Sequence, residues 1–300
     1  MSYRIGVDGG ASKTECILVD ASGATVARHT GPGCSPSLVG AERARLILRE
    51  VLQSLVAGRP APPVDRLLLC MAGSRSFWRE TAAALSGYGR VETAPDSLPV
   101  LELATGGAPG LVVHAGTGSF IAARAPEGTT HYAGGLGWRF GDFGSGYDLG
   151  RRAVARALLE LQGWAQRTAL ADALTAHTGL PDYTANSRFF YIEAEANARI
   201  AAFAPRVIDL AEQSCDAARQ VVAESLADLA GLVNGVLQRL FPDATVDSPL
   251  PCGVSGALLN RTPCLHALRA LAATHVWPVR LQPITAPPIE GVRQLVLKMT

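Results

Sequence analysis

A glycine-rich loop between two apolar segments opens the chain, in the stretch RIGVDGGASKTECILVD from Arg4 to Asp20. The two segments predict strands, and the loop between them predicts a turn between antiparallel neighbours. A P-loop is excluded, because that motif places Gly-Lys-Ser/Thr at the start of a helix, whereas Lys13 follows Ser12 and leads into a strand. The glycine spacing of a dinucleotide-binding fold is absent as well.

This first loop nevertheless suits phosphate. Gly9 and Gly10 allow close approach of the backbone, whose N–H groups can face an anion. Asp8 would repel a bare phosphate, so its place before the loop indicates a Mg²⁺ ion, held through water, between the carboxylate and a nucleotide. The alternative is a plain hairpin turn with an acid at its rim. The side chains that can contact phosphate oxygens are Ser12, Lys13 and Thr14.

A second loop of the same character follows later, in HAGTGSFIAA. Its residues Gly116, Thr117, Gly118 and Ser119 again lie between two strand-like runs. One glycine-hydroxyl loop is weak evidence for a ligand site, but two such loops at corresponding places are stronger evidence. We expect the pair to face each other and to bind a polyphosphate from both sides.

The predicted elements divide the chain into two α/β lobes. The first has five strand-like runs, of which the first three form an antiparallel meander, and a helix at 41–57 with apolar residues at helical spacing. The break TGGAPG near Thr105 marks the lobe boundary. A helix-dominated stretch follows the second loop, with its longest helix at 216–240, and the chain ends in two strands and a short helix.

Composition excludes several other classes of protein. A net charge of +1 without a basic stripe argues against nucleic-acid binding, and the longest uncharged run, 103–123, is interrupted by Gly, Pro, His and Thr, unlike a membrane span. The six cysteines form no CxxC pair and no zinc-like cluster. We therefore expect a cytoplasmic protein without disulfides and without a nucleic-acid or membrane partner.

Three further segments complete a pattern: GGLGWRFGDFGSGYDLGRRA, AAFAPRVIDLAEQSCDAA and the terminal PPIEGV. Together with GVDGGASKT and HAGTGS, they resemble the actin/hexokinase-like ATPase superfamily. Within it, the chain is most similar to the N-acetylglucosamine kinase-like branch, which includes the BadF/BadG/BcrA/BcrD ATPases. The resemblance covers essentially the whole chain, and its most specific part is the GG…GDxGSG signature after a GTGS loop.

The resemblance implies an α/β fold of two ribonuclease-H-like (actin-like ATPase) lobes, with a nucleotide cleft between them and a helical insert in the second lobe. The first lobe is expected at residues 1–107, completed by a C-terminal helix at 290–300. The second lobe is expected at 108–289. ATP and Mg²⁺ are the implied cofactors, and a homodimer is the expected assembly.

The resemblance also implies residue roles. Asp96 takes the place of the family's catalytic base, although Pro95 replaces the usual Asn; from the residues alone, Asp96 could equally be a turn residue or a helix N-cap. An N-cap is also open for Asp142, and plain turns are open for Gly253 and Gly256, the glycines of the implied adenosine loop. The implied sugar-binding residues are Ser35, Asp96, Thr117, Gly135, Trp138 and Asp142.

Three positions depart from the family's usual residues. Phe143 replaces a glutamate, Leu136 replaces a tryptophan, and Asp148 replaces an aromatic residue. These changes lie around the sugar's 2-substituent and leave the phosphate loops intact. A free 2-ammonium group would favour a nearby acid such as Asp148, whereas an acetyl group would favour an aromatic wall such as Trp138.

The function implied by the resemblance is ATP-dependent transfer of the γ-phosphate to the 6-hydroxyl of N-acetyl-D-glucosamine or D-glucosamine. One alternative is an ATPase that activates another enzyme, as some family members do with an iron–sulfur cluster held by cysteines. The scattered cysteines argue against this alternative. Another alternative is a sugar-binding regulator without catalysis, against which the presence of Asp8, Asp96 and both loops argues.

Overall fold

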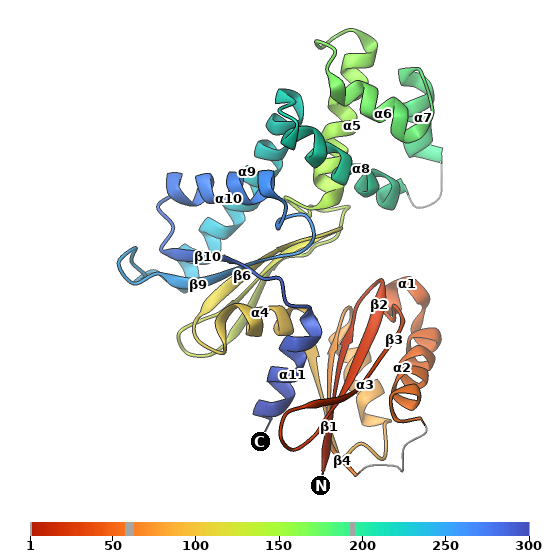
Figure 1. The fold of residues 1–300 in the computed structure, drawn as a ribbon, viewed down its shortest axis with the longest axis vertical. Helices are drawn as coiled ribbons and strands as arrows, with labels where there is room; N and C mark the ends of the chain where they lie inside the picture. Colours follow the sequence, from red (N-terminus) through yellow and green to blue (C-terminus); the bar gives the residue numbers. More distant parts are fainter. Residues whose placement is uncertain (1, 58–62, 193–195, 300) are drawn as a thin grey trace. The chain divides into compact units, whose positions relative to one another are not determined.

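The computed structural model describes residues 2–57, 63–192 and 196–299 (Figure 1). The chain divides into two compact units. Unit 1 comprises Met1–Gly107 and Thr285–Thr300, and unit 2 comprises Ala108–Ile284. Each unit contains one five-stranded mixed sheet with helices packed on it. The α/β, ribonuclease-H-like fold class predicted from the sequence is confirmed.

The sheet of unit 1 has the strand order β3-β2-β1-β4-β5. The first three strands pair antiparallel as a meander, and β1, β4 and β5 run parallel to one another. Parallel strands end at the same edge of a sheet, so the segments that follow β1, β4 and β5 emerge together. The strands are β1 (Tyr3–Gly9), β2 (Lys13–Val19), β3 (Thr25–Pro32), β4 (Val64–Met71) and β5 (Arg90–Pro95).

Helices cover both faces of this sheet. Helix α2 (Ala41–Val56) buries one apolar face on β2 and β3, as its helical spacing predicts. The other face carries α11 (Pro288–Lys298), which packs on β1 and on α4 (Ser97–Thr105). Gly6 permits this approach, because a Cβ there would lie 2.6 Å from Cγ1 of Val292. The remaining helices of the unit are α1 (Pro36–Val39) and α3 (Arg75–Ala83).

Unit 2 repeats the topology with the order β10-β9-β6-β7-β8. Its first three strands again form an antiparallel meander, and β6, β9 and β10 are parallel. The helices between β8 and β9 form the predicted helical insert. The strands are β6 (Gly110–Ala115), β7 (Ser119–Arg124), β8 (Thr130–Gly134), β9 (Leu250–Ser255) and β10 (Val279–Pro283). The helices are α5 (Gly146–Gln162), α6 (Ala169–Thr178), α7 (Tyr183–Ile192), α8 (Ala196–Glu212), α9 (Asp216–Leu240) and α10 (Thr262–Thr274).

Helix α9, predicted at 216–240, supplies much of the core of unit 2. Among the described residues it is the one helix long and apolar enough to cross a membrane by length and composition. Its apolar side chains, including Leu226, Leu229 and Val233, are buried against α5, α8 and α10. A core helix passes the same composition test, and this burial identifies α9 as one.

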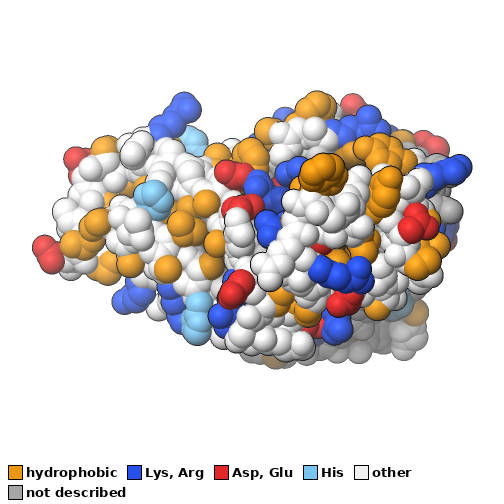
Figure 2. All heavy atoms as spheres, turned by 90° about the horizontal axis from the view of Figure 1, so that it is seen from above, with side chains coloured by type: hydrophobic (Ala, Val, Ile, Leu, Met, Phe, Trp, Pro, Cys, Tyr) orange, Lys and Arg blue, Asp and Glu red, His pale blue; other side chains and the backbone are white. Residues whose placement is uncertain are grey.

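Charges of both signs are interspersed on the molecular face drawn in Figure 2. Basic and acidic side chains lie close to one another on this face and do not form a basic stripe. This arrangement agrees with the formal net charge of +1.

Candidate functional site

The first loop is a tight turn between β1 and β2, in which the N–H of Gly10 donates to the carbonyl of Lys13 at 2.9 Å. Gly9 packs closely on Met71, since a Cβ there would lie 2.4 Å from Cε of that side chain, which would have to move. Gly33 is required, because its Cβ would lie 1.9 Å from the backbone carbonyl oxygen of Ala11. Neighbouring segments of the chain therefore pack against the loop and fix the course of its backbone.

The hydroxyl and lysine side chains of the first loop have different environments. Ser12 is exposed, and Lys13 is half-exposed with its Nζ 2.8 Å from Oε2 of Glu15. Thr14 differs from the sequence prediction: it is 0% exposed, and its hydroxyl donates to the carbonyl of Pro32 at 2.8 Å. Because Thr14 lies in β2 with its side chain pointing inward, the predicted contact of this hydroxyl with phosphate is not supported.

Two carboxyl groups lie at the common edge of the parallel strands of unit 1. Asp8 is near the end of β1, and Asp96 directly follows β5, with β4 between them. The pKa of Asp8 is raised to about 7, first by burial and then by the charge of Asp96, while Lys13 acts in the opposite direction. Burial also raises the pKa of Asp96, and backbone N–H groups at Asp96 and Ser97 partly offset this rise.

Asp96 does not serve as a side-chain helix cap. It occupies the N-cap position of α4, but its backbone is α-helical (φ −61°, ψ −18°) and its carboxyl makes no capping hydrogen bond. The N-cap alternative left open by the sequence is thus not supported for this side chain. Its carboxyl remains available to a ligand.

The acids of unit 1 have the donor chemistry that Mg²⁺ requires. Mg²⁺ binds carboxylate oxygens, commonly one or two of them, and keeps several water ligands. A divalent cation would also favour the ionised form of Asp8, whose pKa is raised by burial and by the charge of Asp96. The residues present therefore fit the predicted metal, with Asp8 as the principal carboxylate.

Ser35 follows a residue that is hydrogen-bonded to the first loop, since the N–H of Cys34 donates to the carbonyl of Gly10 at 3.2 Å. Ser35 is buried, stands at the N-cap of α1 without a capping bond, and shares a hydrogen bond with Ser37 at 3.0 Å. Its neighbour Cys34 would lie 3.0 Å from a Cβ on Gly9, which connects this segment to the first loop. The predicted sugar contact of Ser35 stays a prediction.

The second loop, Gly116 to Ser119, joins β6 and β7 and is docked on the start of α5. The N–H of Gly116 donates to the carbonyl of Gly118 at 2.8 Å, which closes the turn. Gly146 and Tyr147 donate their N–H groups to the carbonyls of Gly116 and Thr117 at 2.8 and 3.3 Å. The first amides of α5 are thus occupied by the loop, whose position they fix.

Ser119, the last residue of this loop, is also engaged internally. It is buried, and its hydroxyl donates to the carbonyl of Phe143 at 2.7 Å. This bond ties the second loop to the segment that carries Asp142. Ser119 therefore supports the loop, and Thr117 is its more accessible hydroxyl residue.

Asp142 lies directly beside the second loop, since a Cβ on Gly118 would be 3.1 Å from its Oδ2. Its Oδ1 accepts a hydrogen bond from the N–H of Gly137 at 3.2 Å. Burial raises the pKa of Asp142, and the Gly137 N–H acts in the opposite direction. The N-cap of α5 is Ser145, so the N-cap alternative is excluded for Asp142.

A cavity of about 630 Å³ adjoins Asp142, and we call it the aromatic cavity. Trp138 is one of its walls, and its predicted sugar contact stays a prediction. Gly135 lies nearby in the chain with φ +62°, and its N–H donates to the carbonyl of Ser119 at 3.0 Å. The N–H of Gly135 already donates to this carbonyl, so a hydrogen bond from Gly135 to a sugar would have to be shared with Ser119. The side chains that line the cavity include Trp138, Arg139, Phe140, Phe143, Tyr147 and Arg151.

Asp148 is 5% exposed and its carboxylate is saturated by donors. Arg151 and Arg152 each donate to Oδ1 at 3.0 Å, and the hydroxyl of Ser225 donates to Oδ2 at 2.7 Å. The N–H of Gly144 approaches Oδ2 at 3.4 Å. With two guanidinium groups bound, Asp148 is not the acid that would receive a free 2-ammonium group, so that suggestion from the sequence is wrong.

A second, smaller pocket of about 190 Å³ extends from the second loop, and we call it the inner pocket. Pro205 lies within α8 and has no N–H, so the carbonyl of Ala201 lacks its usual α-helical donor and can accept a bond from a ligand. Sequence reasoning did not find this pocket. Its lining residues are Gly116, Thr117, Gly146, Ala201, Ala204, Pro205, Ile208, Ala257, Leu258 and Arg261.

The two glycines of the implied adenosine loop lie in different structural elements. Gly256 follows β9 with φ +95°, and a Cβ there would lie 2.1 Å from the carbonyl oxygen of Ala115, so only glycine fits. Gly253 lies inside β9, between β6 and β10, and is buried. The prediction that Gly253 belongs to the loop is wrong, because the apolar run around it forms a central strand. Ala257 and Leu258 line the inner pocket instead.

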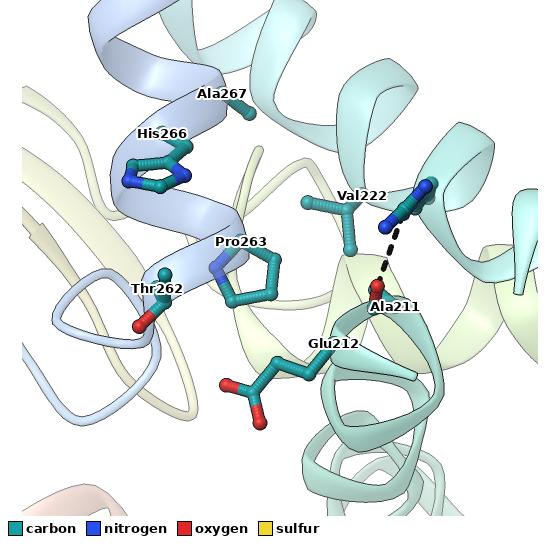
Figure 3. A pocket seen from close by; sticks show the side chains of 8 residues that line it. Ala211, Glu212, Val222, Thr262, Pro263, His266 and Ala267 are labelled. Atoms are coloured by element: carbon teal, nitrogen blue, oxygen red, sulfur yellow. Dashed lines mark hydrogen bonds between the residues drawn. The ribbon is translucent and has the colours of Figure 1, made fainter. Parts of the chain in front are cut away.

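A third, outer pocket of about 670 Å³ lies among α8, α9 and α10 (Figure 3). Arg261, which directly precedes α10 in the sequence, lines the inner pocket. Its guanidinium is held by Asp209 at 2.7 Å and by Glu212 at 3.0 Å, both on α8. In Figure 3, Glu212 and the α10 residues Pro263 and His266 surround the outer pocket, together with Val222 of α9. The ion pairs thus fix Arg261 at the wall of the inner pocket.

Two ribonuclease-H-like units, each with a glycine-rich loop between its first two strands, define the class of actin-like ATPases. The chain belongs to the BadF/BadG/BcrA/BcrD ATPase family, which it matches over residues 5–291.

Individual relatives share this family's sequence and fold. An N-acetyl-D-glucosamine kinase of Dictyostelium discoideum is 24% identical over 266 residues, 82% of this chain and 82% of the relative. An N-acetylmuramic acid/N-acetylglucosamine kinase of Clostridium acetobutylicum is 25% identical over 248 residues, 80% of this chain and 81% of the relative. A crystal structure from Chromobacterium violaceum, named for an N-acetylglucosamine kinase, superposes with a TM-score of 0.78 at 27% identity and covers 99% of both chains.

Proposed function

We propose that the protein is an ATP-dependent amino-sugar kinase that transfers the γ-phosphate to the 6-hydroxyl of N-acetyl-D-glucosamine. The observation that carries this proposal is the pair of acids in unit 1: Asp96, which is partly buried and makes no capping bond, and Asp8, whose pKa is raised by burial and by the charge of Asp96. N-acetylglucosamine is named in both curated relatives, and one of them is also named for N-acetylmuramic acid.

Asp96 is the proposed general base. A carboxylate beside the acceptor hydroxyl can orient it and accept its proton as the phosphoryl group is transferred. A pKa raised by burial brings Asp96 closer to neutral pH, where a base is more effective. Asp142, beside the second loop, would bind sugar hydroxyls through its carboxyl oxygens.

ATP is proposed to bind through the two loops and the inner pocket. The loops offer backbone N–H groups, Thr117 and Lys13 to phosphate oxygens. The inner pocket begins at Gly116 and Thr117, so a nucleotide with its phosphates at this loop would place its base between α8 and the segment after β9. There the carbonyl of Ala201 would accept a bond from an exocyclic amine. Bound Mg²⁺ would supply charge neutralisation for the phosphates and would be held by Asp8 through water.

The acetylated sugar is favoured over the free amine. Asp148, the acid that could have paired with a 2-ammonium group, is already bound by Arg151 and Arg152. Trp138 and Phe143 offer aromatic walls of the kind that suit an acetyl methyl group. A cation entering here would meet guanidinium groups.

The alternative of an iron–sulfur ATPase activator is less well supported. Five of the six cysteines are buried as free thiols and Cys215 is partly buried, and no group of three metal-binding side chains occurs in the described segments. An iron–sulfur ATPase activator would need such thiols at the surface. Free thiols also agree with a reducing compartment, and we infer a cytoplasmic location. The predicted homodimer stays a prediction.

A coupled ADP-release assay tests the function. The assay is run with N-acetylglucosamine, glucosamine, glucose and no sugar, and the product's phosphorylated position is determined by ³¹P NMR. We expect Mg²⁺-dependent ADP release that requires N-acetylglucosamine and yields the 6-phosphate. ADP release without any sugar would support the ATPase alternative, and tight sugar binding without turnover would support the regulator.

A further inference from the structure

His114 is the exception in β6, whose other side chains are small or aliphatic. Burial lowers the pKa of its imidazole to about 4, so the ring is neutral at neutral pH. A phenyl ring would fill the same space without the cost of removing two polar nitrogens from water. The presence of histidine at this position therefore depends on what its ring nitrogens contact.

One ring nitrogen of His114 is hydrogen-bonded to the neighbouring strand. Nδ1 lies 3.2 Å from Oγ of Ser255, the residue paired with His114 in β9. Ser255 is buried and is the last residue of β9. Because a hydroxyl group both donates and accepts, this bond forms with either neutral tautomer of the ring. The bond joins the end of β6 to the end of β9.

These two strand ends lead to the inner pocket. Gly116 directly follows β6, and Ala257 and Leu258 come shortly after Ser255; all three line the pocket. The other ring nitrogen of His114 faces the first of these segments, since a Cβ on Gly116 would lie 3.6 Å from Nε2. His114 is therefore in contact with both chain segments from the sheet that form the pocket, although its own side chain is not part of the lining.

Stacked aromatic rings hold the imidazole plane in place. Phe120 of β7 is paired with His114, and the two rings are stacked with centroids 4.7 Å apart and planes inclined by 15°. Tyr132 of β8 stacks on Phe120 at 5.3 Å and 22°. The row ends at Gly135, where a Cβ would lie 2.3 Å from the Tyr132 hydroxyl oxygen. This stacking restricts rotation of the imidazole and keeps Nδ1 directed at Ser255.

We propose that His114 is a positioning residue for ATP, which acts through its hydrogen bond to Ser255. The bond holds the two segments of the inner pocket at the spacing that the nucleotide requires. This inference rests on the proposed kinase function, which assigns the nucleotide to this pocket. A pocket whose segments are fixed before binding loses less entropy when the ligand binds. The proposed sugar residue Asp142 lies against Gly118, further along the second loop, so His114 should affect ATP and not the sugar.

Two variants remove the hydrogen bond and preserve the ring stacking. His114→Phe keeps an aromatic ring on Phe120, and Ser255→Ala removes the partner hydroxyl. Calorimetry with a non-hydrolysable ATP analogue and Mg²⁺, without sugar, measures the dissociation constant. We expect this constant to rise about fivefold in each variant, the size of one neutral hydrogen bond. The double variant should show the same rise, because both changes remove one and the same bond.

His114→Asn supplies the conservative variant. Its side-chain amide can take the place of Nδ1 in the bond to Ser255, so it should bind the ATP analogue more tightly than His114→Phe does. In the ADP-release assay, His114→Phe should raise KM for ATP about fivefold. It should leave kcat and KM for N-acetylglucosamine within about twofold of the parent values, a split that general destabilisation would not produce.

His177→Phe is the matched control. His177 is also a partly buried histidine of unit 2 beside a phenylalanine, with its ring centroid 5.2 Å from that of Phe203, and it does not line the inner pocket. This variant should leave the dissociation constant of the ATP analogue unchanged. Thermal unfolding verifies that each variant is folded. If His114→Phe does not fold, Ser255→Ala, which retains the imidazole, decides the test by the same criterion.

Dissociation constants within about twofold of the parent in the folded variants that lack the bond would overturn the inference. It would also be overturned if His114→Asn bound no more tightly than His114→Phe, or if KM for the sugar rose as much as KM for ATP. A parent protein that does not bind the ATP analogue would overturn it as well. A parent that binds the analogue and phosphorylates no sugar would contradict the proposed function alone, and the calorimetric comparison would then still decide the role of His114.

Discussion

Asp96 adds its charge to the burial that raises the pKa of Asp8, although β2, β3 and β4 all lie between the two residues in the sequence. They come together because β1 and β5 flank β4 as parallel strands, and parallel strands end at one edge. Cys70 in β4 pairs with Asp8 on one side and with Ala94 on the other. Two acids at one edge suit a site that binds a cation and also accepts a proton.

Replacement of Asp96 by Asn should separate catalysis from nucleotide binding. Loss of a general base lowers rates by about 10²–10⁴-fold. We therefore expect kcat for sugar phosphorylation to fall by about that factor, while the dissociation constant for ATP, measured by calorimetry, changes little. The control is Glu92→Gln, which removes a surface carboxylate from β5, the same strand that Asp96 follows. A kcat for Asp96→Asn near that of the control would remove Asp96 from the role of base.

The raised pKa of Asp8 makes the stability of the protein depend on pH. Between the ordinary value of 3.8 and about 7, the folded state holds a proton that the unfolded state has lost. Stability should therefore fall as pH rises through this window and stay low above it. Asp8→Asn removes the charge, so its Tm should exceed that of the parent at pH 8 by about 3 °C and match it at pH 4.

Added Mg²⁺ provides the second half of this experiment. At pH 8 the ion should raise the Tm of the parent, because it binds the ionised carboxylate, and should have less effect on Asp8→Asn. Differential scanning fluorimetry at pH 4 and pH 8, with and without Mg²⁺, measures all four conditions. Equal Tm values for the two proteins at every pH would show that Asp8 carries no such electrostatic strain.

The sequence predicted the parts of this fold that local patterns specify. Strands of alternating or continuous apolar residues, the meander in unit 1 and the helix at 41–57 follow from short-range patterns. The two loops were recognisable because glycine lets the backbone approach its neighbours closely, as at Gly9, where a Cβ would lie 2.4 Å from Cε of Met71.

The parts that the sequence missed depend on which way a side chain points or on contacts between distant residues. Thr14 lies in a strand, where successive side chains point to opposite faces of the sheet. Which face receives its hydroxyl depends on where the alternation begins, and the sequence does not specify this. Asp148 is saturated partly by Ser225, 77 residues later. The inner pocket is lined by small residues of α8, such as Ala201 and Ala204, which in sequence look like ordinary helix positions. None of these features has a local signal.

Arg261 is expected to contribute to the binding of ATP and not to the binding of the sugar. It lines the inner pocket and is held in place by Asp209 and Glu212. In Arg261→Ala we expect KM for ATP to rise about fivefold, with a smaller change in kcat and no change in KM for the sugar. The surface control Arg167→Ala should change neither value. A rise in KM for the sugar alone would assign Arg261 to a different site.

Asp148 is expected to be a structural residue whose loss destabilises unit 2. Asp148→Asn keeps the shape but leaves Arg151, Arg152 and Ser225 facing a neutral group, and breaking a buried pair by changing one partner costs about 3–5 kcal/mol. Because Arg151 and Arg152 are partly exposed and water can solvate them, we expect the lower end, about 3 kcal/mol. For a unit of this size that corresponds to a Tm lower by about 6–12 °C.

The exposed pair of Arg167 and Asp172 supplies the comparison for this last experiment. Asp172→Asn removes an acid from a surface ion pair, which contributes about 0–1 kcal/mol, so its Tm should stay within about 3 °C of the parent. Urea unfolding of both variants gives the free energies directly. If Asp148→Asn were as stable as Asp172→Asn, the four donors around Asp148 would not be holding α5 to α9, and the acid would again be open to a ligand.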